Sequence, residues 1–546
     1  MGSVSRVYDT NFRISSQSVN GANTVNFGYD NDSLLTTAGS LTITRNAQNG
    51  LISGSTLGAV TDTRGYSTFG ELSTYTANVS GAPVFSVTYT RDKLGRITQK
   101  VETLQGVTDT FVYAYVTAGR LTDVTKNSAL VGHYTYDSNG NRLSHTDATG
   151  TVNGTYDAQD RLSQYGNLQL TYTANGELLT KNNPVLGQTA TFSYDVLGNL
   201  KSVSLPGSIL VEYVVDGQNR RIGKKVNGTL TQGFLYQNQL NPVAQLDGTG
   251  AVDSRFVYGS KANVPDYMVK GGVTYRIVSD HLGSPRLVID TTAGTIIERI
   301  DYDEFGNITA DTNPGFQPFG FAGGLYDQHT GLTRFGARDF DAQVGRWTTK
   351  DPIKFVGGDT NLYGYALNDP VNIVDPSGKL LPLVVIIPVV AGVVNGVFSA
   401  IAASQACDAT ALKTLEAFGN GAVGGIVGSY VGLGVGAATR NPFLAGAAGG
   451  LISNLVEQSL EGQGIDPVAA TVATVGGGIG GAVAPKLFPL AGRRPGLTTL
   501  RKDFGPNSYR LMGQEAAHEL IEGSVGAAAG GLANAINGSR SKGCGC

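Results

Sequence analysis

The amino-acid sequence predicts a mostly β protein of β-hairpins stacked edge to edge, followed by a Gly/Ala-rich helical region at the C-terminal end. Three observations predict this architecture: a Tyr-Asp motif that recurs before residue 378, a high glycine and tyrosine content, and a loss of charge from residue 380 onward. Glycine supplies 76 of 546 residues, about twice the roughly 7% average, and 24 tyrosines stand against one tryptophan. This balance is typical of many short strands joined by tight turns.

The recurring unit places Tyr-Asp, or a close variant, before Gly or Asn, then a basic or polar residue, then Leu or Ile. Asp, Asn and Gly favour tight turns, and flanking runs such as SILVEYVV (208–215) are rich in strand-forming residues. Tyr136, Tyr156, Tyr172 and Tyr194 fall 20, 16 and 22 residues apart, which leaves room for one hairpin per unit. Since one hairpin cannot bury a face alone, successive hairpins are expected to form a continuous sheet in which the tyrosines pack as a layer.

Composition and charge exclude several function classes. The net charge is −3 without a dense Lys/Arg block, so the repeat region is not expected to bind nucleic acid. Three cysteines are too few for a disulfide scaffold, and no zinc or Ser/His/Asp spacing is found, so we expect neither a metal nor a cofactor. The N-terminal stretch MGSVSRVYDTNFR lacks an apolar run of signal-peptide length, so export is expected to use a dedicated machine unless the chain starts inside a longer one.

The tail, residues 379–546, differs from the repeat half because long windows of it carry almost no charge. From Gly424 to Gly436, glycine recurs every four residues, so on a helix these positions line one face and let a second helix approach closely, as in a glycine zipper. The segment 380–402 has about the ~20 residues needed to span a bilayer. The tail is therefore predicted to be helical. Three roles stay open for it: a membrane-acting fragment, a membrane anchor, or a soluble domain buried inside a shell.

Four sequence blocks beyond the first hairpin units occur together in one known family. They are DHLGSPRLVID (280–290), YDEFGN (302–307), GFAGGLYDQHTGLTRFGARDFDAQVGRWTTKDP (320–352) and NLYGYALNDPVNIVDPSG (361–378). Together with the tyrosine–aspartate series, they make residues 29–378 resemble the Rhs/YD-repeat proteins. The last three blocks are similar to the repeat-associated core of that family.

The resemblance implies a full or partial β shell, made by a spiralling strip of hairpins and closed by the core. It divides the chain into a YD-repeat hairpin array (1–278), a repeat-associated core (279–378) and a variable tail (379–546). In this family the core cleaves the chain after its final Asp-Pro-x-Gly, and the released fragment is commonly a toxic effector, as in polymorphic toxins and the C component of Tc toxins. The expected partners are a cognate immunity protein and secretion or delivery machinery. The expected location is secreted or cell-surface, with a role in bacterial competition.

Two aspartates are the candidate catalytic residues. Asp351 and Asp375 each precede a proline, and a hairpin-like segment separates them. Such a segment can bring the two side chains close together. Two carboxylates in contact cannot both ionise cheaply, so one keeps its proton and can polarise a peptide carbonyl while its ionised partner activates a nucleophile. The resemblance assigns autoproteolysis to this pair. It places the cut just beyond the final Asp-Pro-Ser-Gly, which ends at Gly378, and the predicted bond is the one between Lys379 and Leu380.

Other residues near these acids have weaker assignments. Arg346 and Lys350 can orient an acid, although an arginine here suits a strand-face salt bridge equally well. Asp369 also precedes a proline, but its Asn-Asp-Pro setting is typical of a turn cap. The family pattern has Gly where this chain has Lys354, and Leu where it has Lys379. Spacing alone leaves open a plainer interpretation, in which each Asp-Pro pair only starts a turn.

Two functions follow from these patterns. In the first, the hairpin shell cleaves itself and releases a C-terminal fragment that acts on membranes. In the second, an uncleaved cell-envelope protein contacts carbohydrate or another partner through its repeats, and its apolar tail serves as an anchor.

Overall fold

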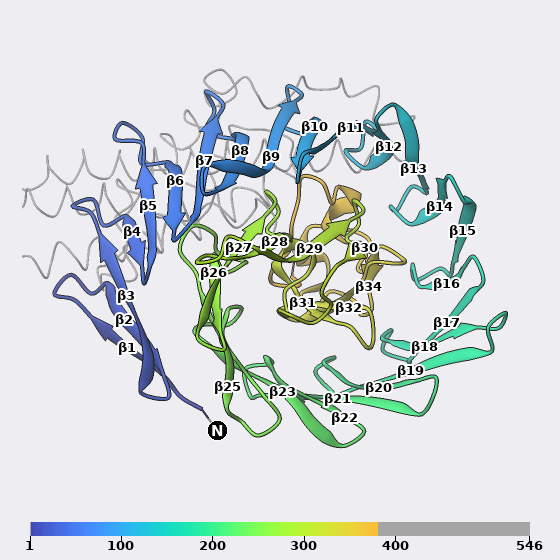
Figure 1. Cartoon of the computed structure of the whole chain (residues 1–546). Helices are drawn as coiled ribbons and strands as arrows, with labels where there is room; N and C mark the ends of the chain where they lie inside the picture. The colour runs from blue at the N-terminus through green and yellow to red at the C-terminus, as the bar shows by residue number, and fades with distance from the viewer. Residues whose placement is uncertain (1, 380–546) are drawn as a thin grey trace, which may run out of the picture. The chain divides into compact units, whose positions relative to one another are not determined.

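The computed structural model describes residues 2–379, which form a long antiparallel strip of strands (Figure 1). Thirty strands, β1 to β30, belong to one sheet, and each strand pairs with the next strand along the chain. The strip begins with β1 (Val4–Tyr8), β2 (Ile14–Val19), β3 (Ala22–Tyr29), β4 (Leu35–Ala38), β5 (Leu41–Arg45), β6 (Ile52–Leu57), β7 (Val60–Tyr66), β8 (Leu72–Val79), β9 (Ala82–Arg91) and β10 (Ile97–Leu104). It continues with β11 (Val107–Tyr115), β12 (Leu121–Lys126), β13 (Ala129–Tyr136), β14 (Arg142–Asp147), β15 (Gly150–Tyr156), β16 (Leu162–Tyr165), β17 (Leu168–Tyr172), β18 (Leu178–Asn183), β19 (Gln188–Tyr194) and β20 (Leu200–Leu205). It ends with β21 (Ile209–Val215), β22 (Arg221–Val226), β23 (Thr229–Tyr236), β24 (Pro242–Leu246), β25 (Val252–Val257), β26 (Tyr267–Lys270), β27 (Val273–Ser279), β28 (Pro285–Asp290), β29 (Ile296–Tyr302) and β30 (Ile308–Asp311).

The strip curves around its own C-terminal end. In Figure 1, β1 to β25 form an outer ring, which we call the wall, and β26 to β30 turn inward as the inner strands. Residues 312–379, which we call the plug, lie inside the ring beside the inner strands. The prediction of a mostly β, hairpin-built shell is confirmed for the described residues. The predicted helical tail lies outside them.

The Tyr-Asp unit is explained by two sets of hydrogen bonds. Each aspartate caps its own turn; for example, Asp92 Oδ1 accepts the N–H groups of Leu94 and Arg96 at 2.8 and 3.0 Å, and Gly95 supplies a φ of 78°. The preceding tyrosine reaches back to an earlier strand, as where the Tyr156 hydroxyl donates to the Arg142 carbonyl at 2.8 Å. The same bond recurs at Tyr29, Tyr66, Tyr115, Tyr236 and Tyr258. Tyrosines of these units also pack against the hydrophobic clusters, which is the role predicted for them: Tyr115, Tyr136, Tyr156, Tyr172 and Tyr194.

The inward face of the wall packs against the inner strands and the plug. Along β9, Phe85, Val87 and Tyr89 are buried and their neighbours are more exposed, as the two-residue period of a strand requires. These side chains join a hydrophobic cluster with Leu287 and Ile289 of β28. A second cluster joins wall residues from β16 to β21 to Leu332 and Val344 of the plug. The inner strands and the plug therefore stabilise the wall that surrounds them.

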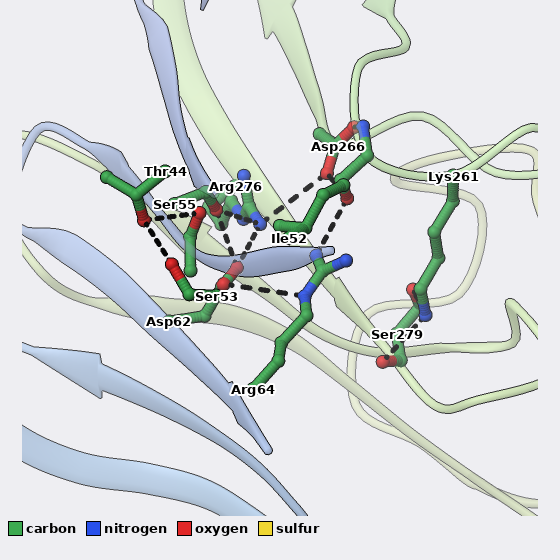
Figure 2. Close-up of polar contacts among 12 residues, drawn as sticks. Thr44, Ile52, Ser53, Ser55, Asp62, Arg64, Lys261, Asp266, Arg276 and Ser279 are labelled. Carbon is green, nitrogen blue, oxygen red and sulfur yellow. Dashed lines mark hydrogen bonds and ion pairs between the residues drawn. The ribbon is translucent and has the colours of Figure 1, made fainter. Parts of the chain in front are cut away.

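Polar contacts also join the start of the wall to the inner strands. Figure 2 shows Asp62 of β7 and Arg276 of β27 pointing toward each other, with an oxygen-to-nitrogen distance of 2.6 Å. Ser55 of β6 donates to the Asp62 carboxylate at 2.6 Å, and Asp266 lies 3.5 Å from Arg276 on its other side. All four side chains are buried, so this paired charge network joins the wall to the inner strands.

The plug contains a small antiparallel sheet and three short 3₁₀ turns. Its strands are β31 (Leu325–Asp327), β32 (Leu332–Phe335), β33 (Arg338–Asp341) and β34 (Arg346–Trp347), and its turns are η1 (Phe321–Gly323), η2 (Lys354–Gly357) and η3 (Ala366–Asn368). Phe335, Phe340, Trp347 and Tyr365 pack in its centre in T-shaped and tilted pairs, with ring centroids 4.4 to 6.3 Å apart. This aromatic centre fixes the small sheet that carries the candidate site.

The division of the chain can be compared with the predicted domains. Residues 2–379 all belong to one compact unit. Strands β27 and β28 pair across the predicted boundary between residues 278 and 279, so the sheet continues from the repeats into the core. None of the helices in the 2–379 range is long and apolar enough to cross a membrane. The predicted membrane-length segment 380–402 lies outside the described residues.

Candidate self-cleavage site

The two predicted aspartates meet on one arginine. Arg338, at the start of β33, places its Nη2 atom 2.7 Å from Asp351 Oδ2 and 3.2 Å from Asp375 Oδ2. All three side chains are at most 7% exposed. Asp351 follows β34 and Asp375 follows η3, so the loop between these acids returns them to each other's side, as the sequence predicts. Their catalytic role stays a prediction.

The same cluster holds the predicted cleavage segment. Arg338 Nε donates to the carbonyl oxygen of Gly378 at 2.6 Å, and Asp375 Oδ1 accepts the N–H of Lys379 at 3.0 Å. The hydroxyl oxygen of Ser377 lies 2.9 Å from both the Asp375 carboxylate and the carbonyl oxygen of Lys379. One guanidinium and one carboxylate therefore contact the two ends of the Gly378–Lys379 peptide group.

Only glycine fits at position 378. Its φ is 62°, and a Cβ added there would lie 2.3 Å from the carbonyl oxygen of Phe335 and 2.8 Å from the backbone nitrogen of Arg338. The backbone nitrogen of Ala337 also donates to the carbonyl of Ser377 at 2.9 Å. Close backbone approach to the β32–β33 turn thus sets the position of the segment before Leu380.

Burial changes the proton affinity of two acids in the cluster. Burial raises the pKa of Asp351; the Arg338 guanidinium opposes this rise and the Asp375 carboxylate adds to it. A third acid, Asp359, lies beside them, and burial raises its pKa to about 6. Arg338, Asp351 and Asp359 line a cavity of about 10 Å³ with Asn361, which is room for about one water molecule. No motif or spacing in the sequence singles out Asp359.

The predicted orienting residues lie elsewhere. The Arg346 guanidinium covers the rings of Tyr156 and Tyr363, and its Nη2 donates to the carbonyl of Asp160 at 2.5 Å. Lys350 reaches Gln159 of the wall at 3.5 Å. Within residues 2–379, neither side chain hydrogen-bonds to the two acids, so Arg338 occupies the position for which Arg346 and Lys350 were considered. Arg338 lies inside one of the family sequence blocks, on a strand of sequence RDFD in which three of four residues are charged, so its charge does not single it out.

Two further predictions concern turns. Asp369 lies in a turn, as expected: its backbone carbonyl accepts the N–H of Ile373 at 3.1 Å and its carboxylate accepts the side-chain amide of Asn372 at 2.7 Å. Burial raises the pKa of Asp369 to about 6. Lys354 has a φ of 54°, a left-handed conformation that favours glycine. The family glycine at this position therefore has a conformational reason, and the lysine here is strained.

No group of three or more His, Cys, Asp or Glu side chains suited to a metal ion is found among residues 2–379. The two predicted aspartates are bonded to Arg338, which also bonds to the backbone carbonyl of Gly378.

The wall of hairpins, the inward plug and the paired acids can now be compared with known proteins. The family model described as Teneurin YD-shell matches residues 2–371. The chain belongs to this family. This match confirms the predicted resemblance to YD-repeat proteins, since the model spans the wall, the inner strands and most of the plug.

Individual relatives come from animals and bacteria. Teneurin-1 of Mus musculus is 30% identical over 281 residues, which covers 49% of this chain and 10% of the relative. The tRNA3(Ser)-specific nuclease WapA of Bacillus spizizenii is 28% identical over 283 residues, which covers 50% of this chain and 12% of the relative. The matched region thus spans only about a tenth of the length of these proteins.

Solved structures show the same fold. The crystal structure of TcdB2-TccC3 matches with a TM-score of 0.57 and 19% identity, over 69% of this chain and 22% of the matched chain. A Photorhabdus luminescens Tc holotoxin pore matches with a TM-score of 0.56 and 17% identity, over 70% of this chain and 21% of the matched chain. At these identities the similarity concerns the fold alone.

Proposed function

We propose that residues 2–379 form a YD-repeat shell that cleaves its own chain at the end of the plug and releases the C-terminal tail. The observation that supports this proposal best is the convergence on Arg338 of Asp351, Asp375 and the carbonyl oxygen of Gly378. Peptide hydrolysis requires proton transfer next to a peptide bond that is held in place. Two neighbouring acids beside such a bond can carry out this transfer.

The proposed reaction is a hydrolysis in which the two acids divide the proton transfers. Asp351, whose pKa burial raises, holds the shared proton, and its ionised partner removes a proton from a water molecule. The water oxygen bonds to the carbonyl carbon of Lys379 and the bond to the Leu380 nitrogen breaks as that nitrogen gains a proton. The products are a carboxylate on Lys379 and a free amine on Leu380.

The contacts of the cleavage segment support a cut near this position. The carbonyl oxygen of Lys379 lies beside the Ser377 hydroxyl, which also contacts Asp375. The preceding peptide group, Gly378–Lys379, contacts Arg338 and Asp375 directly and is the competing bond. The two products differ by one lysine, so intact mass separates them.

The wider role that we propose is that of an Rhs-type toxin or effector. It rests on the relationship to the nuclease WapA and on the fold shared with the Tc complexes. In this role the shell is exported to the cell surface or beyond it by a delivery machine, other toxin components assemble with it, and an immunity protein protects the producing cell. The released tail acts on the membrane of a competitor, the activity inferred from its uncharged windows.

One observation favours a second candidate, an uncleaved cell-envelope protein that binds carbohydrate or another partner. Both acids also cap their own turns: Asp351 Oδ1 accepts the N–H of Ile353 at 2.9 Å, and Asp375 Oδ1 accepts that of Lys379 at 3.0 Å. Turn capping alone gives each aspartate a structural reason to be present.

Replacement of single aspartates separates the two candidates. The full chain is expressed as wild type and as Asp351→Asn, Asp375→Asn and Asp369→Asn, and each product is weighed by mass spectrometry. We expect the wild type and Asp369→Asn to be cut, because Asp369 is a buried turn residue outside the cluster. The first two variants should stay whole. Cleavage of Asp375→Asn at the wild-type rate, or an uncut wild type, would exclude the acid pair as a protease.

A further inference from the structure

Strand β33 joins the candidate site to the wall. Alternate residues of a strand point to opposite faces, and side chains on both faces of β33 make contacts with the rest of the chain. Arg338 points to the two acids and Phe340 to the aromatic centre, whereas Asp339 and Asp341 pair with side chains from other strands. All four residues are buried.

Asp339 is held between two arginines. Its Oδ1 atom lies 2.8 Å from Nη2 of Arg221, in wall strand β22, and its Oδ2 atom lies 2.9 Å from Nη1 of Arg334, in β32. The Arg221 guanidinium in turn lies 3.5 Å from the centre of the Tyr213 ring. Asp339 is thus fixed to the wall at the residue that follows Arg338.

Asp341 is held by a second wall strand. Its Oδ2 atom lies 2.7 Å from Nζ of Lys181, in β18. The same wall strand bonds to the chain that leads to Asp351: the backbone nitrogen of Leu178 donates to the carbonyl of Thr348 at 2.9 Å, and Thr348 donates from its own backbone nitrogen to Asp339 at 3.0 Å. Both ends of β33 and the approach to Asp351 therefore depend on wall contacts.

These contacts are remote in sequence. Lys181 and Asp341 are 160 residues apart, and Arg221 and Asp339 are 118 apart. Each pair closes a long loop, which costs conformational entropy that a short-range contact does not. The position of Arg338 therefore depends on wall strands that are remote in sequence.

We infer that Lys181 and Arg221 are positioning residues for self-cleavage, and that the site becomes competent only when the wall has closed on β33. This inference rests on the proposed function. It makes cleavage dependent on completion of the shell, so a partly wound chain would keep its tail attached.

Two similar ion pairs, of which only one reaches β33, allow a controlled test. Lys224 of β22 lies 2.8 Å from Asp327 of β31, so it also joins the wall to the plug through buried charges, but it does not contact β33. Lys181→Met and Lys224→Met each remove one lysine from such a pair. The full chain is made by cell-free translation, and the appearance of the 380–546 fragment is followed over time.

We expect Lys181→Met to slow cleavage at least tenfold and Lys224→Met to change it less than threefold, while urea unfolding shows comparable losses of stability. Lys181→Arg, and the exchange of Lys181→Asp with Asp341→Lys, should restore most of the rate, which a general loss of stability would not explain. Equal rates for Lys181→Met and wild type would overturn the inference, as would equal slowing by both methionine variants. An uncut wild type would remove the proposed function, and this inference with it.

Discussion

The replacement of Arg338 by methionine would disturb the candidate site most directly. It removes the cation that lies 2.7 and 3.2 Å from two buried carboxylates, together with the hydrogen bond to the Gly378 carbonyl. At an effective dielectric constant of about 20, a pair of unit charges about 3 Å apart attracts by about 5 kcal/mol. Removal of one partner from a buried pair costs about 3–5 kcal/mol net, since the remaining charge loses its compensation. We expect a loss of this size and no cleavage.

The assay uses the chain's single tryptophan. The Cζ atom of Arg338 lies 4.1 Å from the centre of the Trp347 ring, so tryptophan fluorescence in a urea titration reports on this site. Arg299→Met is the control, because Arg299 pairs with Asp301 but is 32% exposed, where an ion pair contributes about 0–1 kcal/mol. If Arg338→Met unfolded within about 1 kcal/mol of wild type and was still cut, the argument for a charge-linked site would be wrong.

Two other replacements test the described fold. Burial, with the Asp311 carboxylate adding to it, raises the pKa of Glu298 from 4.5 to about 8. The stability that its proton provides is present below pH 4.5 and lost as the pH rises to 8. Thermal unfolding should therefore show Glu298→Gln gaining on wild type over this range, by up to about 5 kcal/mol, and a pH-independent difference would contradict the shift. Lys354→Gly should raise the free energy of unfolding by about 1 kcal/mol by relieving a φ of 54°, whereas Lys350→Gly should not; destabilisation by Lys354→Gly would refute the strain.

The hairpin array could be predicted from the sequence because its signal is local. Asp92, for example, caps a turn whose partners lie two and four residues away, and such short-range bonds repeat with each unit. The inward turn of β26 to β30 was not predictable in the same way. Strands of the wall and inner strands carry similar patterns, and long-range pairs such as Asp62 with Arg276 decide where the strip folds back.

The candidate site was predictable only in part. Asp351 and Asp375 stand out because each precedes a proline in a recognised block, and the structure places both on one guanidinium. Arg338 could not be chosen from spacing, since it lies on an earlier strand and reaches the acids through the packing of the small plug sheet. Asp359 was missed because its importance comes from burial beside Asp351, which no local pattern reveals.

The most direct test of the account is the mass and N-terminal sequence of the fragments from the purified, full-length wild-type chain. The account predicts two products, one ending at Lys379 and one beginning at Leu380. A single uncut chain under native conditions, or a cut remote from Gly378, would contradict the claim that Asp351, Asp375 and Arg338 form a self-cleaving site.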